Sequence, residues 1–396
     1  MRFTITHQSG GARAGILETP HGSIETPAFV PVGTRASVKS LSGQQLHELG
    51  VQVFFVNTYH IMQRPGVPII RRFRGLHGFM HWDRPLMTDS GGYQAFSLGL
   101  GMEHGVGKMS NMFPGEHRGP PARKAQPLAK IDDSGITFKS HLDERRITLT
   151  PRDSIRIQEA LGADIIMALD ECTSPLSDYG YVEKAVQRTH EWAKICKEVH
   201  KKKAQALYGI IQGSDFKDLR QEAADDISAL DFPGIAIGGS MGRTKKDMHR
   251  ILGWVVRRLD AEKPRHLLGI GYVDDVFAAV QRGIDTFDCV VPTRHARSGL
   301  LFISPQAGGR RENKWRIQID NKRFKADTRP LDPHCGCPVC RSYSRAYLNH
   351  LFNMKELAFY QLATYHNVHF FMRLMEEIRE AIHADTFAKL RRSWLK

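Results

Sequence analysis

Two aspartates stand where short apolar runs end. Asp89 follows the run Pro-Leu-Met-Thr and precedes Ser-Gly-Gly, and Asp288 lies within Phe-Asp-Cys-Val. An unpaired carboxylate inside an apolar run is costly, which disfavours a purely structural role for Asp288. Asp89 could instead cap a helix or turn. Two carboxyl groups on separate strand ends can act as a nucleophile and as a general acid/base, although residue type does not say which does which. The pair predicts an enzyme.

Three further residues, Cys335, Cys337 and Cys340, predict a metal site because they supply three thiolates within a short stretch. Structural zinc takes four nitrogen or sulfur ligands in a tetrahedron, so a fourth ligand must come from elsewhere. His366 is favoured, because a helix between it and the cysteines can return the chain to them. The competing ligands are His334, His350 and His369. A filled four-ligand site leaves no position for water, so this zinc is predicted to be structural.

The two aspartates belong to a repeating pattern of apolar runs, each ending in polar residues or glycine. The runs are 29–33, 53–57, 85–89, 165–170, 207–212, 235–239, 267–271 and 287–291. Helix-like stretches lie between most of them, at 154–161, 182–202, 217–229, 246–259 and 273–282. Buried parallel strands read as continuous apolar runs, and eight strand–helix units match a (β/α)8 TIM barrel, whose active site lies at the carboxyl ends of the strands. A doubly wound open sheet is the alternative, but no glycine-rich phosphate turn follows the first run.

The pattern divides the chain into two predicted parts. Residues 1–304 form the barrel, with a loop insertion at about 99–132 that is rich in Gly, Pro, Lys and Arg. Residues 305–396 form a basic, zinc-binding C-terminal subdomain, with an exposed strand at 315–319 and two helices at roughly 341–364 and 367–382. The insertion is expected to lie on the active-site side of the barrel.

Composition indicates a globular protein with a polyanionic partner. The net charge is +14, with 41% hydrophobic and 25% charged residues. Past residue 307 the excess of basic over acidic residues is about 8, which suits a polyphosphate, although a solvated surface is equally compatible. No signal peptide or apolar membrane span is seen, so a cytoplasmic location is expected. Cys172, Cys196 and Cys289 stand singly, which favours thiols over disulfides.

Several motifs resemble those of the queuine tRNA-ribosyltransferases of bacterial type, also called tRNA-guanine transglycosylases. They are NTYH (57–60), TDSGGYQ (88–94), FKSHLD (138–143), LDEC (169–172), IQG (211–213), IGG (237–239), FDCVVPTR (287–294) and the Cys/His set. The resemblance runs from about residue 2 to about residue 385. It implies a TIM barrel with a zinc subdomain that exchanges the wobble guanine of GUN-anticodon tRNAs (Asp, Asn, His, Tyr) for queuine or its aminomethyl precursor, both 7-deazaguanine bases, in queuosine modification.

The resemblance also implies residue roles. Asp288 would be the nucleophile, Asp89 the general acid/base and His366 the fourth zinc ligand. The base would be held by Asp170, Gln212 and Gly239 and stacked on by Tyr93, while Arg294 and Arg297 would contact the anticodon loop. A guanine edge offers N–H donors to a carboxylate and an O6 acceptor to an amide, as these residue types require. A homodimer is expected. Asp170 could otherwise cap a turn, and the two arginines could be surface ion-pair partners.

The motif after Gly239 departs from the family pattern, which normally has a leucine next and ends in Gly-Glu. Here 240–244 reads Ser-Met-Gly-Arg-Thr. If Gly242 replaces a bulkier residue, the pocket has room for the cyclopentenediol of queuine, which favours the queuine-salvaging subset of the family. Cys172, however, matches the form that takes the aminomethyl precursor. The alternative functions are a non-catalytic tRNA-binding paralogue and a relative that modifies another nucleic-acid site. A metal-dependent barrel hydrolase is disfavoured, because the strand ends offer no His-x-His or carboxylate ligand set.

Overall fold

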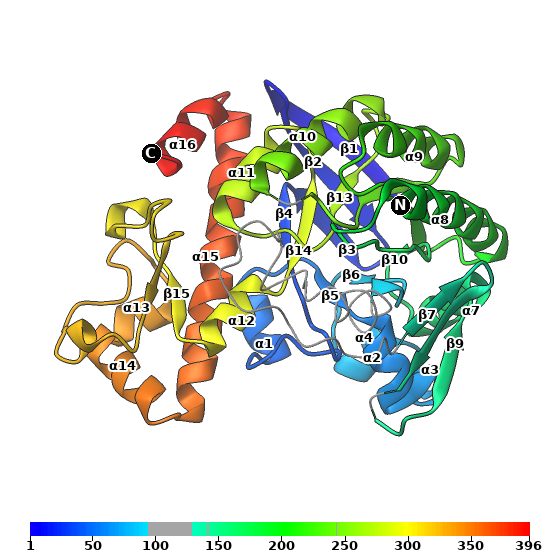
Figure 1. Cartoon of the computed structure of the whole chain (residues 1–396). Coiled ribbons are helices and arrows are strands. Elements are labelled where there is room, and N and C mark those ends of the chain that lie inside the picture. The colour runs from blue at the N-terminus through cyan, green and yellow to red at the C-terminus, as the bar shows by residue number, and fades with distance from the viewer. Residues whose placement is uncertain (94–128, 141, 243) are drawn as a thin grey trace.

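A closed parallel barrel forms the centre of the molecule in the computed structural model, which describes residues 1–93, 129–140, 142–242 and 244–396 (Figure 1). Its eight strands have the order β4-β14-β13-β12-β11-β10-β6-β5. A parallel bridge between Val32 and Phe55 joins the first and last strands of this order, with Gly33 N donating to Phe55 O at 2.7 Å. The strands are β4 (Ala28–Pro31), β5 (Phe54–Val56), β6 (Leu86–Thr88), β10 (Ile165–Met167), β11 (Ala206–Ile211), β12 (Gly234–Ile237), β13 (Arg265–Leu267) and β14 (Thr286–Cys289). All eight predicted runs and the TIM barrel are therefore confirmed.

Two apolar layers hold the barrel together. One fills its interior and includes Val30, Met87 and Ile210, and the other lies between the strands and the surrounding helices. The helices that follow strands are α7 (Pro151–Leu161), α8 (Tyr179–Val199), α9 (Lys217–Ala229), α10 (Lys245–Val255), α11 (Val273–Val280) and α12 (Val291–Arg297). Capping boxes begin two of them: Thr150 pairs with Asp153 in α7, and Thr244 with Asp247 in α10. These reciprocal bonds satisfy amides that a helix start leaves open.

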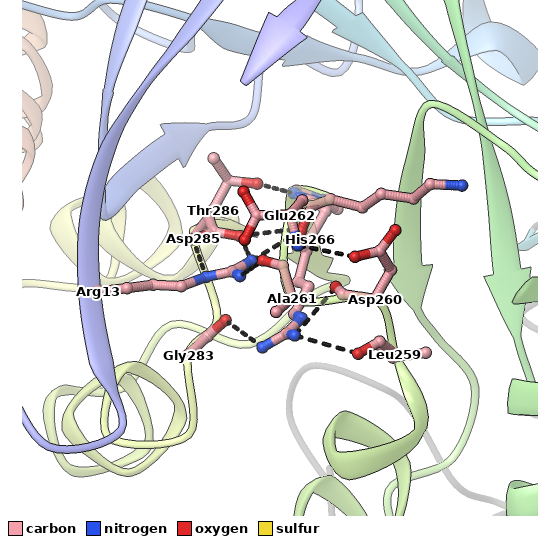
Figure 2. A network of polar contacts seen from close by, with 11 residues as sticks. Arg13, Leu259, Asp260, Ala261, Glu262, His266, Gly283, Asp285 and Thr286 are labelled. Carbon is pink, nitrogen blue, oxygen red and sulfur yellow. Dashed lines mark hydrogen bonds and ion pairs between the residues drawn. The ribbon is translucent and has the colours of Figure 1, made fainter. Parts of the chain in front are cut away.

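An antiparallel sheet that the sequence pattern did not reveal covers the amino ends of the barrel strands. It consists of β1 (Arg2–Ser9), β2 (Ala12–Thr19) and β3 (Gly22–Thr26), and its Leu17 and Ile24 join the apolar cluster inside the barrel. Arg13 of β2 anchors the sheet: its Nε donates to Asp285 Oδ1 at 2.8 Å, and its NH2 contacts Asp285 Oδ2 at 2.5 Å (Figure 2). Arg265 N donates to the same carboxylate at 2.6 Å. This buried network closes the bottom of the barrel.

The segment between β6 and α7 contains a second added sheet, made of β7 (Ala129–Asp132), β8 (Gly135–Lys139) and β9 (Arg146–Leu149). The predicted loop at 99–132 was thus wrong at its end, because residues 129–132 pair with β8. The rest of that loop lies outside the described residues. Short helices α1 (Gly43–Glu48), α2 (Thr58–Ile61), η1 (Met62–Gly66), α3 (Val67–Arg72) and α4 (Leu76–Met80) fill the earlier connections.

The C-terminal part contains a strand pair and four helices, and the long helix α15 runs between the barrel and the smaller elements (Figure 1). The elements are β15 (Leu300–Phe302), β16 (Arg316–Gln318), α13 (Pro338–Ser342), α14 (Arg345–Asn353), α15 (Leu357–His383) and α16 (Phe387–Trp394), with the short turns η4 (Pro305–Ala307) and η5 (Lys322–Phe324). A further short turn, η3 (Val256–Arg258), follows α10 in the barrel. The predicted helix break near residue 366 was wrong. The break lies at Lys355, whose φ of 58° is left-handed, so His366 is inside α15.

The strand predicted at 315–319 is confirmed as β16, but it is not simply exposed. Trp315, Ile317 and Ile319 are buried, and the strand pairs with β15 across the predicted boundary near residue 304. The division of the chain at that residue stays a prediction. None of the helices in the described ranges is long and apolar enough to cross a membrane.

Candidate active site and metal centre

Asp288 lies near the carboxyl end of β14, on the barrel face where predicted site residues from the other strands also emerge. Its Oδ1 accepts Gly269 N at 2.8 Å and lies 3.2 Å from His266 Nε2. The other nitrogen of His266 contacts Thr286 Oγ1 at 2.8 Å, which fixes the ring in place. The Asp288 side chain remains 13% exposed. Both contacts use Oδ1, so the carboxylate is oriented while the group stays accessible.

Asp89 follows β6 and is partly buried beside the start of α2. Thr58 N donates to Asp89 Oδ1 at 2.7 Å, and Asn57 Nδ2 donates to Oδ2. Burial raises the pKa of Asp89 to about 7, opposed by the Thr58 amide and assisted by the negative charges of Asp288 and Asp170. A carboxyl group with this pKa can both give and accept a proton near neutral pH. The two predicted catalytic aspartates therefore influence each other electrostatically.

Asp170, Gln212 and Gly239 meet at the ends of β10, β11 and β12. Gln212 Nε2 donates to Asp170 Oδ2 at 2.6 Å, and Ser90 Oγ donates to Asp170 Oδ1 at 3.2 Å. Gly239 has a φ of 77°, and a Cβ there would lie 1.9 Å from Gln212 Oε1. Only glycine lets the backbone come this close to the amide. The structure thus places the Asp170 carboxylate, the Gln212 side-chain amide and the backbone of Gly239 side by side.

The turn that carries Tyr93 is held against the same group. Gly91 has a φ of 83°, and a Cβ on Gly92 would lie 2.8 Å from Asp170 O. Glycines are required here because the turn approaches the next strand end closely. Tyr93 comes directly after this turn and is partly buried. The turn therefore brings Tyr93 to the edge of the group formed by Asp170, Gln212 and Gly239.

A cationic cluster lies beside this face. Arg294 is exposed and Arg297 is partly buried on α12. The pKa of Lys39 is lowered by burial and by the positive charges of Arg297, Arg35 and Arg294. Four cations gathered in this way form a ready site for an anion. The sequence analysis did not single out Arg35 and Lys39, although both lie in the loop that follows the first barrel strand.

Cys335, Cys337, Cys340 and His366 form a compact group whose ligand atoms all lie within 4.8 Å of one another. The three sulfurs lie 3.9, 3.5 and 3.4 Å from His366 Nδ1. Tetrahedral zinc with usual bond lengths separates sulfur and nitrogen ligands by roughly 3.6 Å. The donor set and the spacing therefore fit a zinc site.

The orientation of His366 supports the same assignment. His366 Nε2 lies 2.7 Å from Phe302 O, an arrangement that places the proton on Nε2 and leaves Nδ1 free to bind metal. Of the competing histidines, His369 has its Nδ1 3.5 Å from Cys335 Sγ, but it is not part of the four-residue group, and neither are His334 and His350. His366 is the ligand that the fold presents to all three cysteines.

The remaining cysteines are thiols rather than disulfides, as predicted. Burial raises the pKa of Cys196 and of Cys289 to about 12, so neither is a reactive thiolate at neutral pH. Cys172 is buried two residues after Asp170.

Gly242 has a conformational explanation that is independent of any base. Its φ is 84°, and a Cβ there would lie 2.3 Å from Asp247 Cβ. Asp247 belongs to the capping box that begins α10. The turn into the helix therefore requires glycine at this position. Extra room for a base substituent is not needed to account for Gly242, and the prediction of queuine as substrate remains untested.

Comparison with known proteins identifies the family. The sequence model described as queuine tRNA-ribosyltransferase matches residues 8–396. A putative queuine tRNA-ribosyltransferase of Archaeoglobus fulgidus is 49% identical, over 100% of this chain and 99% of that protein. The queuine tRNA-ribosyltransferases of Caldanaerobacter subterraneus (44% identical, covering 97% of this chain and 94% of that protein) and Geobacillus kaustophilus (42%, covering 100% and 96%) are also similar. The chain therefore belongs to the queuine tRNA-ribosyltransferase family of tRNA-modifying glycosyltransferases.

Proposed function

We propose that this enzyme exchanges the wobble guanine of GUN-anticodon tRNAs for a 7-deazaguanine base through a covalent aspartyl-ribosyl intermediate. The observation that carries the proposal is the placement of Asp288 and Asp89 on one barrel face beside Asp170 and Gln212. One carboxylate is oriented and accessible, the other has a pKa of about 7, and the donor–acceptor pair of Gln212 and Asp170 lies at strand ends on the same face. This combination suits chemistry at the glycosidic bond of a purine-like base.

In the first half of the reaction an Asp288 oxygen attacks the anomeric carbon of the ribose. The glycosidic bond breaks, its electron pair stays with guanine, and protonated Asp89 delivers a proton to the departing base. His266 and the Gly269 amide orient the nucleophile through Oδ1. The positive charge that develops on the sugar is trapped as an ester, as in retaining glycosidases.

In the second half Asp89, now ionised, takes the proton from the ring nitrogen of the incoming base. That nitrogen attacks the anomeric carbon and the ester oxygen leaves, so Asp288 returns to its ionised form. Asp170 accepts N–H groups of the base edge, while the Gln212 amide and the Gly239 N–H donate to the O6 acceptor. The hydrogen bond from Gln212 to Asp170 must be given up when the base enters between them.

The RNA, the metal and the oligomer complete the proposal. Arg294 and Arg297, together with Arg35 and Lys39, contact phosphates of the anticodon loop, where bases can leave their stack at low cost. The cysteine and histidine group holds structural zinc. A homodimer in the cytoplasm is the proposed assembly.

The test is exchange of labelled guanine into a wobble-guanine tRNA, followed by a denaturing gel for a protein–RNA adduct. Wild-type enzyme should show exchange and an adduct, and Asp288→Ala should show neither. Asp89→Ala should lose exchange, because no group then protonates the leaving base. Undiminished exchange by Asp288→Ala would contradict the mechanism.

The identity of the base needs a separate experiment. Cys172 and the motif at 240–244 gave opposite predictions, and of the two we propose queuine. Wild-type enzyme should therefore replace guanine with queuine when both bases are offered to the same guanine-containing tRNA. Incorporation of the aminomethyl base alone would rule this out without affecting the mechanism.

A further inference from the structure

Arg220 is a fully buried arginine that forms no ion pair with any described residue. It lies on α9, and its guanidinium donates only to backbone carbonyls and a sulfur. Nε donates to Ser214 O at 2.8 Å, NH1 to Ile211 O at 3.1 Å and Gly238 O at 3.0 Å, and NH2 to Ser240 O at 2.6 Å. Burial lowers the pKa of Arg220 to about 10, so the group stays charged at neutral pH. The charges of Cys172 and Asp215 oppose this lowering of the pKa. A buried guanidinium that forms no ion pair is still costly unless its hydrogen bonds are made.

The four carbonyls come from two loops that carry proposed base-binding residues. Ile211 and Ser214 flank the loop of Gln212, and Gly238 and Ser240 flank Gly239. One guanidinium therefore sets the distance between these loops. The backbone also joins the two loops, since Gly238 N donates to Ile211 O at 3.1 Å.

Peptide geometry extends this effect to the base-binding groups themselves. A trans peptide is planar, and its C=O and the next N–H point in opposite directions. Because Gly238 O points at Arg220, the N–H of Gly239 must point away from it. In the same way, Ile211 O directs the N–H of Gln212 away from Arg220. Gly239 lies against the Gln212 amide, which itself binds Asp170.

We infer that Arg220 is a positioning residue for base recognition, which holds the loops of Gln212 and Gly239 so that the Gly239 N–H faces the base. It acts through the backbone and touches no substrate. The inference rests on the proposed function and adds a residue to it. Only a planar fork of five donors can serve two loops at once, so lysine cannot replace it.

The experiment compares Arg220→Lys with Arg265→Lys as the matched control. Arg265 is also buried, and its side chain donates to the carbonyls of Gly283, Leu259 and Asp260, but at the opposite end of the barrel (Figure 2). Steady-state exchange is measured with varied free guanine and with varied tRNA. Arg220→Lys should raise the KM for guanine about tenfold, the equivalent of one lost hydrogen bond, and change the KM for tRNA less than twofold. Arg265→Lys should lower Tm and leave both KM values unchanged.

A second variant and a wild-type measurement cover the case in which Arg220→Lys does not fold. Millimolar guanidinium ion should lower the KM for guanine in Arg220→Ala and have no such effect in Arg265→Ala. In the wild type without base, the Gly238 amide should exchange slowly with deuterium, because the loops are already held together. An unchanged KM for guanine in folded Arg220→Lys, absent rescue in folded Arg220→Ala, or fast Gly238 exchange would each overturn the inference. If the wild type exchanges no guanine at all, it is the proposed function that fails.

Discussion

Asp285, just before β14, and Asp288, within it, are three residues apart, and their surroundings are opposite in kind. Asp285 is fully buried at the bottom of the barrel, where Arg13 and the Arg265 amide supply its hydrogen bonds. Asp288, near the other end of β14, has a histidine and one amide as neighbours and keeps some exposure. At about 3.3 Å per residue, the two carboxylates are only roughly 10 Å apart along the chain.

The strand β10 repeats this contrast. Asp164, just before the strand, receives His21 Nδ1 at 2.8 Å, Leu86 N at 2.9 Å and a contact from His77 at 3.4 Å. Asp170, beyond the other end, adds its negative charge to those that raise the pKa of Asp89. At the bottom, Asp285 pairs with Arg13 and Asp164 contacts two histidines. At the top, the negative charges of Asp288 and Asp170 help to raise the pKa of Asp89. We therefore expect the bottom face to stabilise the barrel and the top face to bind the substrate, as is usual in TIM barrels.

The largest expected effect comes from removing the charge of Asp288. Asp288→Asn keeps the size of the side chain but removes the nucleophile, so exchange should fall by at least about a thousandfold. Tm should change by no more than a few degrees, because Asp288 has no ion-pair partner apart from His266 in the described chain. Single-turnover exchange and thermal unfolding measure the two quantities. A large drop in Tm with residual activity would reverse the roles assigned to the two ends.

The matched change at the bottom is Asp285→Asn, and its effect should appear in stability. Arg13 would be left buried without a counterion, which costs about 3–5 kcal/mol in the free energy of unfolding. The kcat and both KM values of the folded fraction should stay within a factor of two of wild type. Denaturant unfolding and exchange kinetics at low temperature test this, and a selective loss of kcat would show that the two ends are not independent.

The sequence predicted the barrel well because buried parallel strands leave an unambiguous apolar run. It also predicted the group of three cysteines and His366 that could hold a metal ion, since three closely spaced cysteines need few assumptions about the fold. It failed where the signal depends on tertiary contacts. The break between α14 and α15 was misplaced because Lys355, not glycine, takes the left-handed conformation.

Residues whose partners come from distant parts of the chain were also missed. Arg220 and His266 look like an ordinary helix arginine and a strand histidine until the fold brings carbonyls and Asp288 to them. The role of Arg13 could not be predicted for the same reason, because its partner Asp285 is 272 residues away in the sequence. Gly242 shows that one residue can have two explanations. The sequence pattern suggested room for queuine, which stays a prediction, and the geometry shows that the turn itself needs glycine.

The pH dependence should be a property of the top face and of Asp89 in particular. Guanine release needs Asp89 protonated, so its single-turnover rate should be constant below its pKa of about 7 and fall tenfold per pH unit above it. Asn57→Ala removes a donor that stabilises the ionised form of Asp89, so the fall should move to higher pH. Asp285→Asn serves as the control and should leave the profile in place. An unchanged profile in Asn57→Ala would assign the titration to another group.

The smallest effect is expected at Asp164, where pH should change stability rather than rate. Burial alone would raise its pKa, but hydrogen bonds from His77, His21 and the Leu86 amide hold the pKa of Asp164 below its usual value. A depressed carboxyl pKa contributes stability that is complete above the unfolded pKa of about 4 and is lost as the pH falls through the lower folded value. Asp164→Asn should therefore lower the free energy of unfolding by about 1 kcal/mol at pH 7, and the difference from wild type should shrink as the pH is lowered below 4.

Urea unfolding of both proteins at several pH values measures this difference. A difference that persists unchanged in acid would mean that packing, and not the charge of Asp164, holds this end of the barrel.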